Sequence, residues 1–84
     1  MTTKNAVIWT QNNCVEGILA AKAVVAQGYT YAFNNIDSKE FTKDELLAAV
    51  PGVKTVPQIF IDGELVGGLP QLLTLLKITA TIPK

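Results

Sequence analysis

The chain has 84 residues, of which 49% are hydrophobic, and its seven basic and seven acidic side chains give a formal net charge of zero. A chain of this length predicts a single domain, residues 1–84, around one core. Zero net charge argues against a nucleic-acid or membrane-surface partner, both of which need a basic patch. No apolar stretch is long enough to span a bilayer, and the N-terminus lacks a signal-peptide pattern, so we expect a cytoplasmic protein.

The chain contains one cysteine, Cys14, and no histidine. Without histidine, Ser-His-Asp and Cys-His catalysis are excluded, and the commonest metal ligand is missing. A lone cysteine cannot form an internal disulfide or a two-cysteine metal site within one chain. We therefore predict no metal site in the protein itself, and any redox chemistry must be completed by a thiol from another molecule.

The N-terminal part of the chain predicts a strand followed by a helix. Residues 6–10 are apolar and partly β-branched, which is typical of a buried strand. Asn13 and Glu16 have the spacing of a capping box, with Asn13 as N-cap, which predicts a helix over residues 14–27. Gly28 is its expected stop, because glycine enters the left-handed conformation without steric cost.

A second strand and a second helix follow. Residues 29–36 are rich in aromatic and β-branched side chains, which favours a strand parallel to the first through a right-handed crossover. Thr42 and Glu45 form another capping box, so a helix is expected to begin there. It should end at Val50, because the Pro-Gly pair that follows cannot continue it.

The last part of the chain predicts a hairpin and a third helix. Residues 58–61 and 64–66 flank Asp62 and Gly63, a pair that suits a type I′ turn between antiparallel strands. Residues 70–77 predict a helix with proline at its first position. The element order is therefore β-α-β-α-β-β-α, an α/β fold with a mixed sheet of about four strands flanked by helices.

Cys14, in the first turn of the first predicted helix, is the candidate reactive group. Unpaired backbone N–H groups and the positive end of the helix dipole favour a thiolate at such a position. Glu16 opposes this effect as a nearby carboxylate, although capping alone explains its presence. Free cysteines are often buried core residues, and this alternative stays open. The polar run of Gln11, Asn12 and Asn13 argues against a dry surrounding.

Thr55-Val56-Pro57 comes directly before a predicted strand. A trans bond before Pro57 would make the segment an ordinary edge feature, which is the commoner case. A cis bond would turn the Val56 backbone N–H and C=O outward, where they could pair with an extended, peptide-like ligand. Gly67 and Gly68 would likewise offer backbone amides to an anion, or serve only as turn residues.

The order and spacing of these segments resemble the glutaredoxin family over nearly the whole chain. The resemblance is carried by Ile8-Trp9-Thr10-Gln11-Asn12-Asn13-Cys14, by Thr55-Val56-Pro57-Gln58-Ile59-Phe60-Ile61-Asp62-Gly63 and by Val66-Gly67-Gly68. It implies a thioredoxin-like fold, a cis peptide before Pro57 and glutathione as the thiol co-substrate. The implied glutathione groove lies beside Cys14 and comprises Gln11, Thr55, Val56, Pro57, Gly68, Leu69 and Pro70.

The chain departs from the dithiol members of this family at Gly17, where those proteins have a second cysteine. The resemblance therefore implies a monothiol mechanism, in which Cys14 takes glutathione from a protein mixed disulfide and a second glutathione regenerates the thiolate. A glycine inside a helix costs about 1 kcal/mol relative to alanine, so it calls for a reason, and close approach of a ligand is one candidate. The sequence Cys-Val-Glu-Gly also differs from the Cys-Gly-Phe-Ser of cluster-carrying members, which disfavours a glutathione-bridged iron–sulfur dimer.

Two further departures concern glutathione binding. Gln11 stands where many members have a lysine that pairs with a glutathione carboxylate, and Lys54 is a candidate for the missing cation. Leu69 and Pro70 stand where the family usually has an aspartate for the γ-glutamyl amine, and Pro70 also lacks a backbone donor. We therefore expect weaker glutathione affinity than in a typical member.

These observations predict a monomeric, glutathione-dependent thiol–disulfide oxidoreductase that works through Cys14. Its expected partners are glutathione and glutathionylated or disulfide-containing proteins. The second hypothesis is an iron–sulfur carrier that dimerises around a cluster. The third is a binding module that keeps the fold and has lost the chemistry, for which Glu16, Gly17 and Pro70 argue together.

Overall fold

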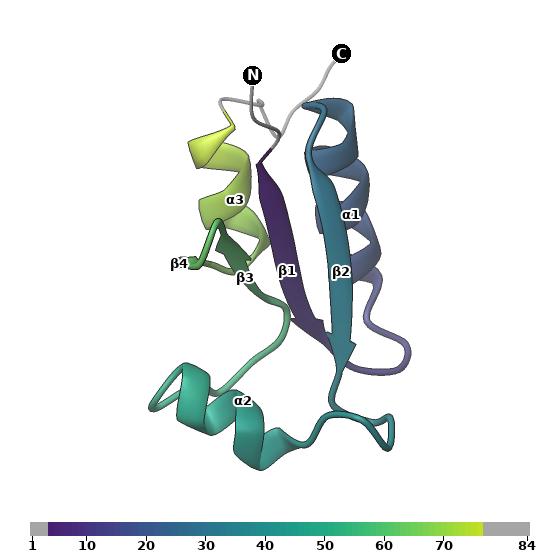
Figure 1. The fold of residues 1–84 in the computed structure, drawn as a ribbon, viewed down its shortest axis with the longest axis vertical. Coiled ribbons are helices and arrows are strands. Elements are labelled where there is room, and N and C mark those ends of the chain that lie inside the picture. The colour runs from purple at the N-terminus through teal and green to yellow at the C-terminus, as the bar shows by residue number, and fades with distance from the viewer. Residues whose placement is uncertain (1–3, 77–84) are drawn as a thin grey trace.

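The strands form one four-stranded mixed sheet in the order β2-β1-β3-β4 (Figure 1). β2 runs parallel to β1, whereas β3 is antiparallel to both β1 and β4. The computed structural model describes residues 4–76. Its elements are β1 (Asn5–Thr10), α1 (Val15–Ala26), β2 (Thr30–Asn35), α2 (Lys43–Ala49), β3 (Gln58–Ile61), β4 (Glu64–Gly67) and α3 (Leu69–Leu75). This order confirms the predicted thioredoxin-like arrangement of strands and helices.

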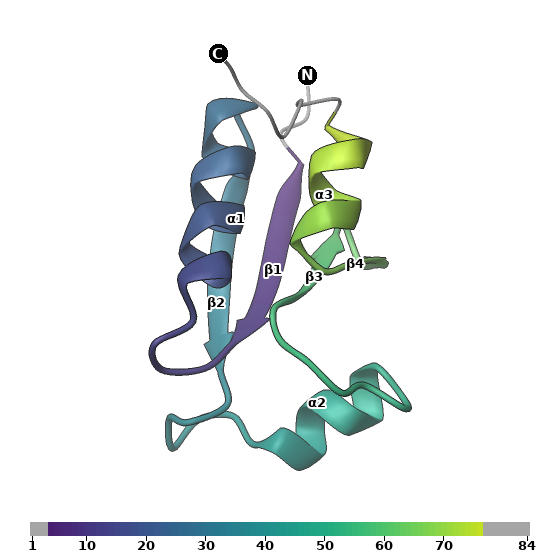
Figure 2. The same cartoon turned by 180° about the vertical axis from the view of Figure 1, so that it is seen from behind.

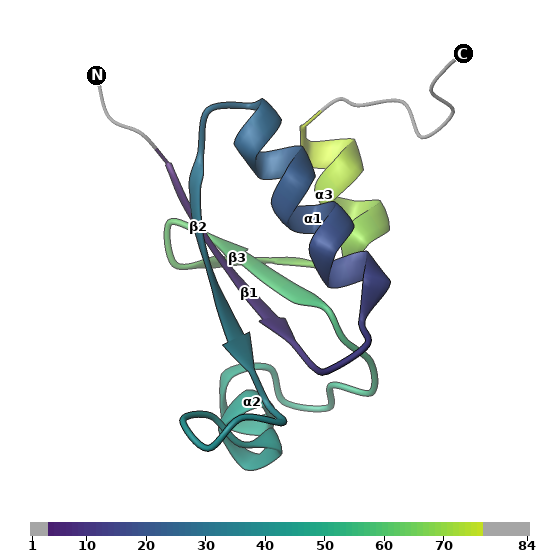
Figure 3. The same ribbon diagram turned by 90° about the vertical axis from the view of Figure 1, so that its right-hand side faces the viewer.

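α1 and α3 lie together on one face of the sheet, and α2 lies beyond the carboxyl ends of β1 and β2 (Figures 1, 2 and 3). Burying the apolar side chains between the two helices and the sheet supplies most of the driving force for folding. None of the helices within residues 4–76 is both long and apolar enough to cross a membrane. The buried cluster consists of Ala6, Ile8, Ala20, Ala21, Val24, Ile59, Ile61, Leu72 and Leu76.

Several local signals act as the sequence predicts. The Thr42 hydroxyl accepts a hydrogen bond from the Glu45 amide at 3.1 Å, and the Glu45 carboxylate accepts one from the Thr42 amide at 2.8 Å. This reciprocal pair fixes the start of α2. Asp62 and Gly63 have φ angles of 51° and 87°, as a type I′ turn requires. Gly28 ends α1 in the left-handed region, with φ 83°.

The predicted cap of α1 is wrong, and α1 and α2 each end one residue before the predicted position. Asn13 has a φ of 61°, in the left-handed region, so it cannot adopt the extended conformation of an N-cap. Cys14, with φ −98° and ψ 95°, is the N-cap instead, and the Asn13–Glu16 capping box does not form. α3 begins at Leu69 rather than Pro70. The predicted end of this helix at residue 77 lies outside the described residues.

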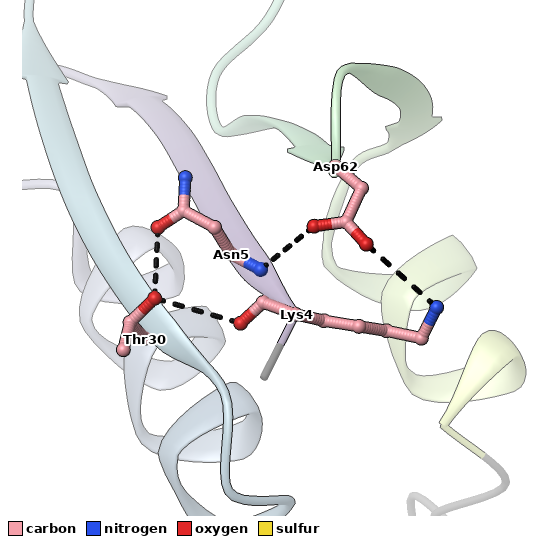
Figure 4. Close-up of polar contacts among 4 residues, drawn as sticks. All are labelled: Lys4, Asn5, Thr30 and Asp62. Atoms are coloured by element: carbon pink, nitrogen blue, oxygen red, sulfur yellow. Dashed lines mark hydrogen bonds and ion pairs between the residues drawn. The ribbon is translucent and has the colours of Figure 1, made fainter. Parts of the chain in front are cut away.

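The amino end of β1 is tied to both of its neighbours (Figure 4). The Asn5 amide donates to the Asp62 carboxylate at 2.9 Å, and the Thr30 hydroxyl donates to the Asn5 side-chain oxygen at 2.9 Å. Lys4 and Asp62 form an exposed ion pair at 3.8 Å, which contributes little by itself. These contacts join three strands at the end of the sheet opposite α2, and the carboxyl end of β1 carries the candidate site.

Candidate functional site

Cys14 occupies the N-cap of α1, directly beyond the loop that follows β1. It is half-buried and has a free thiol. An N-cap side chain lies next to the backbone N–H groups of the first helical turn, which have no partner within the helix. The dry-core alternative for Cys14 is therefore wrong, because the sulfur lies at a partly open helix end beside polar residues.

Gly17 is the residue on α1 that lies against Thr10 of β1. A Cβ atom added to Gly17 would come within 2.5 Å of the Thr10 hydroxyl oxygen and 3.2 Å of the Thr10 Cβ. It would also lie 3.5 Å from the Cys14 sulfur. The nearest atoms therefore belong to the protein itself, and they supply a reason for glycine that the sequence alone did not reveal. Glycine allows the first turn of the helix to approach the strand.

A polar network holds the loop before Cys14 against the end of β2. The Asn12 amide donates to the Asp37 carboxylate at 2.9 Å, and the Asn35 side-chain amide donates to the Asn12 side-chain oxygen at 3.0 Å. The Asp37 amide in turn donates to the Asn35 side chain at 2.7 Å. Sequence analysis missed this network, since nothing in the local spacing pairs Asn12 with residues 23 and 25 positions away.

The peptide bond between Val56 and Pro57 is cis, as the resemblance implies. The Gln58 side chain donates to the Thr55 carbonyl at 3.0 Å and holds the segment in place. Among residues 4–76, the Val56 backbone N–H and C=O make no hydrogen bond. They are consequently open to an extended ligand.

A cavity of about 250 Å³ brings part of the predicted glutathione groove together. It includes Gln11, Thr55 and Val56, and the cations Lys43 and Lys54 line the same space. Gln11 also lines a second cavity, of about 440 Å³, to which Cys14 belongs. The Asp37 carboxylate also lines the smaller cavity, so the loop before Cys14 links the sulfur to a cavity with two lysines and one aspartate. Lys43, from α2, was not among the predicted site residues.

Gly68, Leu69 and Pro70 line neither of these two cavities. A Cβ on Gly68 would lie 3.6 Å from the Pro57 carbonyl oxygen, so this turn does pack beside the cis-proline segment. The Gly68 amide donates to the Gln71 side-chain oxygen at 3.0 Å. It is therefore not the bare amide that the sequence suggested, and an anion could bind it only after displacing Gln71.

No cluster of three or more metal-ligating side chains occurs within residues 4–76. Another cavity, of about 690 Å³, lies near the amino end of β1 and contains neither Cys14 nor any predicted glutathione residue. The candidate site therefore consists of the Cys14 sulfur, the Val56 edge and the cavity that Lys43 and Lys54 line.

The model of the glutaredoxin family matches residues 6–66 of the chain. The chain belongs to the glutaredoxin family. The match spans β1 to β4 and includes both Cys14 and the cis-proline segment. Among curated protein sequences, no relative matches significantly.

Solved glutaredoxin structures share the fold. The reduced Escherichia coli glutaredoxin is 29% identical, with a TM-score of 0.69, over 87% of this chain and 93% of that one. Glutaredoxin 1 from Francisella tularensis, complexed with cacodylate, is 25% identical, with a TM-score of 0.69, over 86% and 91%. A buckwheat glutaredoxin–glutathione complex, 23% identical with a TM-score of 0.63 over 90% and 83%, shows the fold alone. A redox function of the glutaredoxin type follows from this membership.

The contact between α1 and β1 predicts that residue 17 must be glycine as long as residue 10 is threonine. We expect Gly17→Ala to destabilise the protein by about 1–3 kcal/mol through overpacking, despite the higher helix propensity of alanine. The same substitution in a Thr10→Ala background should cost less, because the nearest clashing atom is gone. Chemical unfolding of the wild type, the two single variants and the double variant gives the free energy of coupling between the two positions. Equal costs of Gly17→Ala in both backgrounds would contradict the proposed contact.

Proposed function

We propose that this glutaredoxin is a glutathione-dependent oxidoreductase that uses a monothiol mechanism. The Cys14 thiolate attacks the glutathione sulfur of a protein–glutathione mixed disulfide. A Cys14–glutathione disulfide forms, and the protein thiolate leaves and takes up a proton. A second glutathione thiolate then attacks the glutathione sulfur of this adduct, which releases oxidised glutathione and restores the Cys14 thiolate. Overall, one disulfide replaces another: the protein cysteine is reduced to a thiol, the second glutathione thiol is oxidised, and oxidised glutathione leaves.

The observation that carries this proposal is the placement of the only cysteine of the chain at the N-cap of α1. An attacking sulfur there is only half-buried and lies at the open end of the helix. Position 17 holds a glycine packed against Thr10, so the helix offers no second thiol to complete an internal disulfide. A thiol from outside the protein must therefore release the adduct.

Two features support glutathione as that thiol. The open backbone groups of Val56 suit the extended cysteinyl part of a tripeptide. The cavity lined by Gln11, Lys43 and Lys54 has two cations and one carboxylate, Asp37, so its net positive charge favours a carboxylate ligand. We propose that these lysines replace the missing lysine at position 11. Gly68, Leu69 and Pro70 remain predicted glutathione contacts on the opposite side of Pro57.

The iron–sulfur alternative would need a dimer in which Cys14 from each subunit and two glutathiones supply four thiolates. No feature of residues 4–76 favours it over simple exchange. The third hypothesis, a binding module without chemistry, predicts a thiol no more reactive than free cysteine. A measured alkylation rate of Cys14 at neutral pH distinguishes it from the proposed enzyme.

Substitution of the nucleophile is the first test of the mechanism. We expect Cys14→Ser to abolish turnover of the mixed disulfide between glutathione and 2-mercaptoethanol, because serine cannot form the sulfur adduct. Turnover is measured as oxidised glutathione released, and an unchanged unfolding transition shows that the variant folds. Robust turnover by this variant would refute the proposal.

Removal of the cavity cations is the second test. We expect Lys54→Gln and Lys43→Gln each to raise the KM for glutathione about two- to fivefold, because a partly exposed ion pair contributes up to about 1 kcal/mol. The effect should shrink at high salt, which screens such pairs. Lys4→Gln, at the far end of the sheet, is the matched control and should leave KM unchanged. If the wild type and all three lysine variants have the same KM, the glutathione carboxylate does not bind in this cavity.

A further inference from the structure

An apolar groove runs from Cys14 along the free edge of the sheet. The cavity at Cys14 also includes Val15, Ile18 and Phe33. A second cavity, of about 390 Å³, continues from it between α1 and β2 and shares Ile18 and Phe33 with the first. Figures 1 and 2 show α1 and β2 side by side at this edge. We call these two joined cavities the edge groove.

The side chains in the edge groove are exposed although they are large and apolar. The exposed fractions are 53% for Ile18 and for Val25, 43% for Tyr31 and 40% for Phe33. The two aromatic rings pack edge to face, with centroids 5.2 Å apart. Contiguous apolar surface of this kind, beside a reactive group, is typical of a binding site. It lies on the β2 side of Cys14, whereas the Val56 edge lies on the β3 side.

β2 is an edge strand, and one side of its backbone is unpaired in the sheet. The Thr30 amide donates to the Lys4 carbonyl at 3.0 Å and the Ile36 amide to the Thr10 carbonyl at 2.9 Å, so even-numbered residues face β1. In a parallel ladder the alternate residues face away. The backbone groups of Tyr31 and Phe33 therefore point outward, where an extended chain can pair with them.

The register of α1 matches the spacing of an extended chain along this edge. The helix rises about 1.5 Å per residue, so Ile18 lies about 6 Å and Lys22 about 12 Å from Cys14 along the helix axis. An extended chain covers about 6.6 Å in two residues and about 13 Å in four, with both side chains on the same face. Lys22 is the only charged residue that lines the edge groove within residues 4–76.

We propose that the edge groove binds the substrate protein as an extended segment that adds a strand to β2. The segment has an apolar residue two positions from its glutathionylated cysteine, against Ile18, and an acidic residue four positions away, against Lys22. This inference rests on the proposed function and names its substrate class. Glutathione occupies the Val56 side of Cys14, and the leaving protein thiolate departs along the β2 side after the same exchange.

The test compares two glutathionylated peptides with a central cysteine. Both have valine two positions before and after the cysteine. One peptide has glutamate, and the other has lysine, at the fourth position before the cysteine and at the fourth position after it. Each peptide can therefore place that residue against Lys22 whichever way its chain runs along β2. The mixed disulfide of glutathione with 2-mercaptoethanol serves as a substrate that is too small to extend from Cys14 to Lys22 and Tyr31 in the second cavity. The variants are Ile18→Ser and Lys22→Glu, and Leu19→Ser is the matched control, because Leu19 is 45% exposed on α1 but lies outside the edge groove.

We expect Ile18→Ser to lower kcat/KM for the glutamate peptide at least about fivefold, because the lost apolar burial removes more than 1 kcal/mol. Lys22→Glu should reverse the preference between the two peptides. Leu19→Ser should change neither kcat/KM for the glutamate peptide nor the preference between the peptides. Lys22→Glu, which lies outside the cavity at Cys14, and Leu19→Ser should both retain turnover of the small disulfide.

Each other outcome has a distinct meaning. If the wild-type protein does not turn over the small disulfide, the proposed function fails and the inference fails with it. If it does, but Ile18→Ser and Lys22→Glu behave as the control does toward both peptides, the inference alone is overturned. If the wild-type protein sediments as a dimer and Ile18→Ser as a monomer, a second copy occupies the edge groove, which also overturns it.

Discussion

The close contact between Gly17 of α1 and Thr10 of β1 is the constraint on which the site depends. Thr10 is buried, and a Cβ at position 17 would lie 2.5 Å from its hydroxyl oxygen. This contact lets the first helical turn pack directly against the end of the strand. Cys14 then becomes the N-cap between the two elements. The same glycine occupies the position at which dithiol glutaredoxins have their second cysteine. This one residue therefore determines both how α1 packs against β1 and that the helix has no second thiol.

The surroundings of Cys14 divide into two sides with different chemistry. On the β3 side lies the Val56 backbone, and beyond the ends of β1 and β2 lies the cavity that Lys43, Lys54 and Asp37 line. On the β2 side lies the apolar edge groove. Thiol–disulfide exchange on a glutathionylated protein needs room for both glutathione and a protein chain. In the mechanism that we propose, the two sides give these two molecules separate places.

Sequence reasoning reached the fold because local signals and burial agree. The Thr42 capping box and the Asp62-Gly63 turn are short-range features that need no tertiary information. It failed at Asn13, because side-chain spacing could not show that this residue adopts a positive φ. It also missed Lys43, which reaches the cavity only through the placement of α2, and it left Gly17 without its neighbour Thr10. These errors share one cause, since each depends on contacts between elements.

The proposed function depends on the exchange of the Cys14 sulfur with glutathione. Mass spectrometry of the intact protein after exposure to oxidised glutathione tests this exchange directly. We expect a single glutathione adduct per chain, located on the peptide that contains Cys14 and removed by reduced glutathione. A protein that stays unmodified under conditions that glutathionylate free cysteine would contradict it.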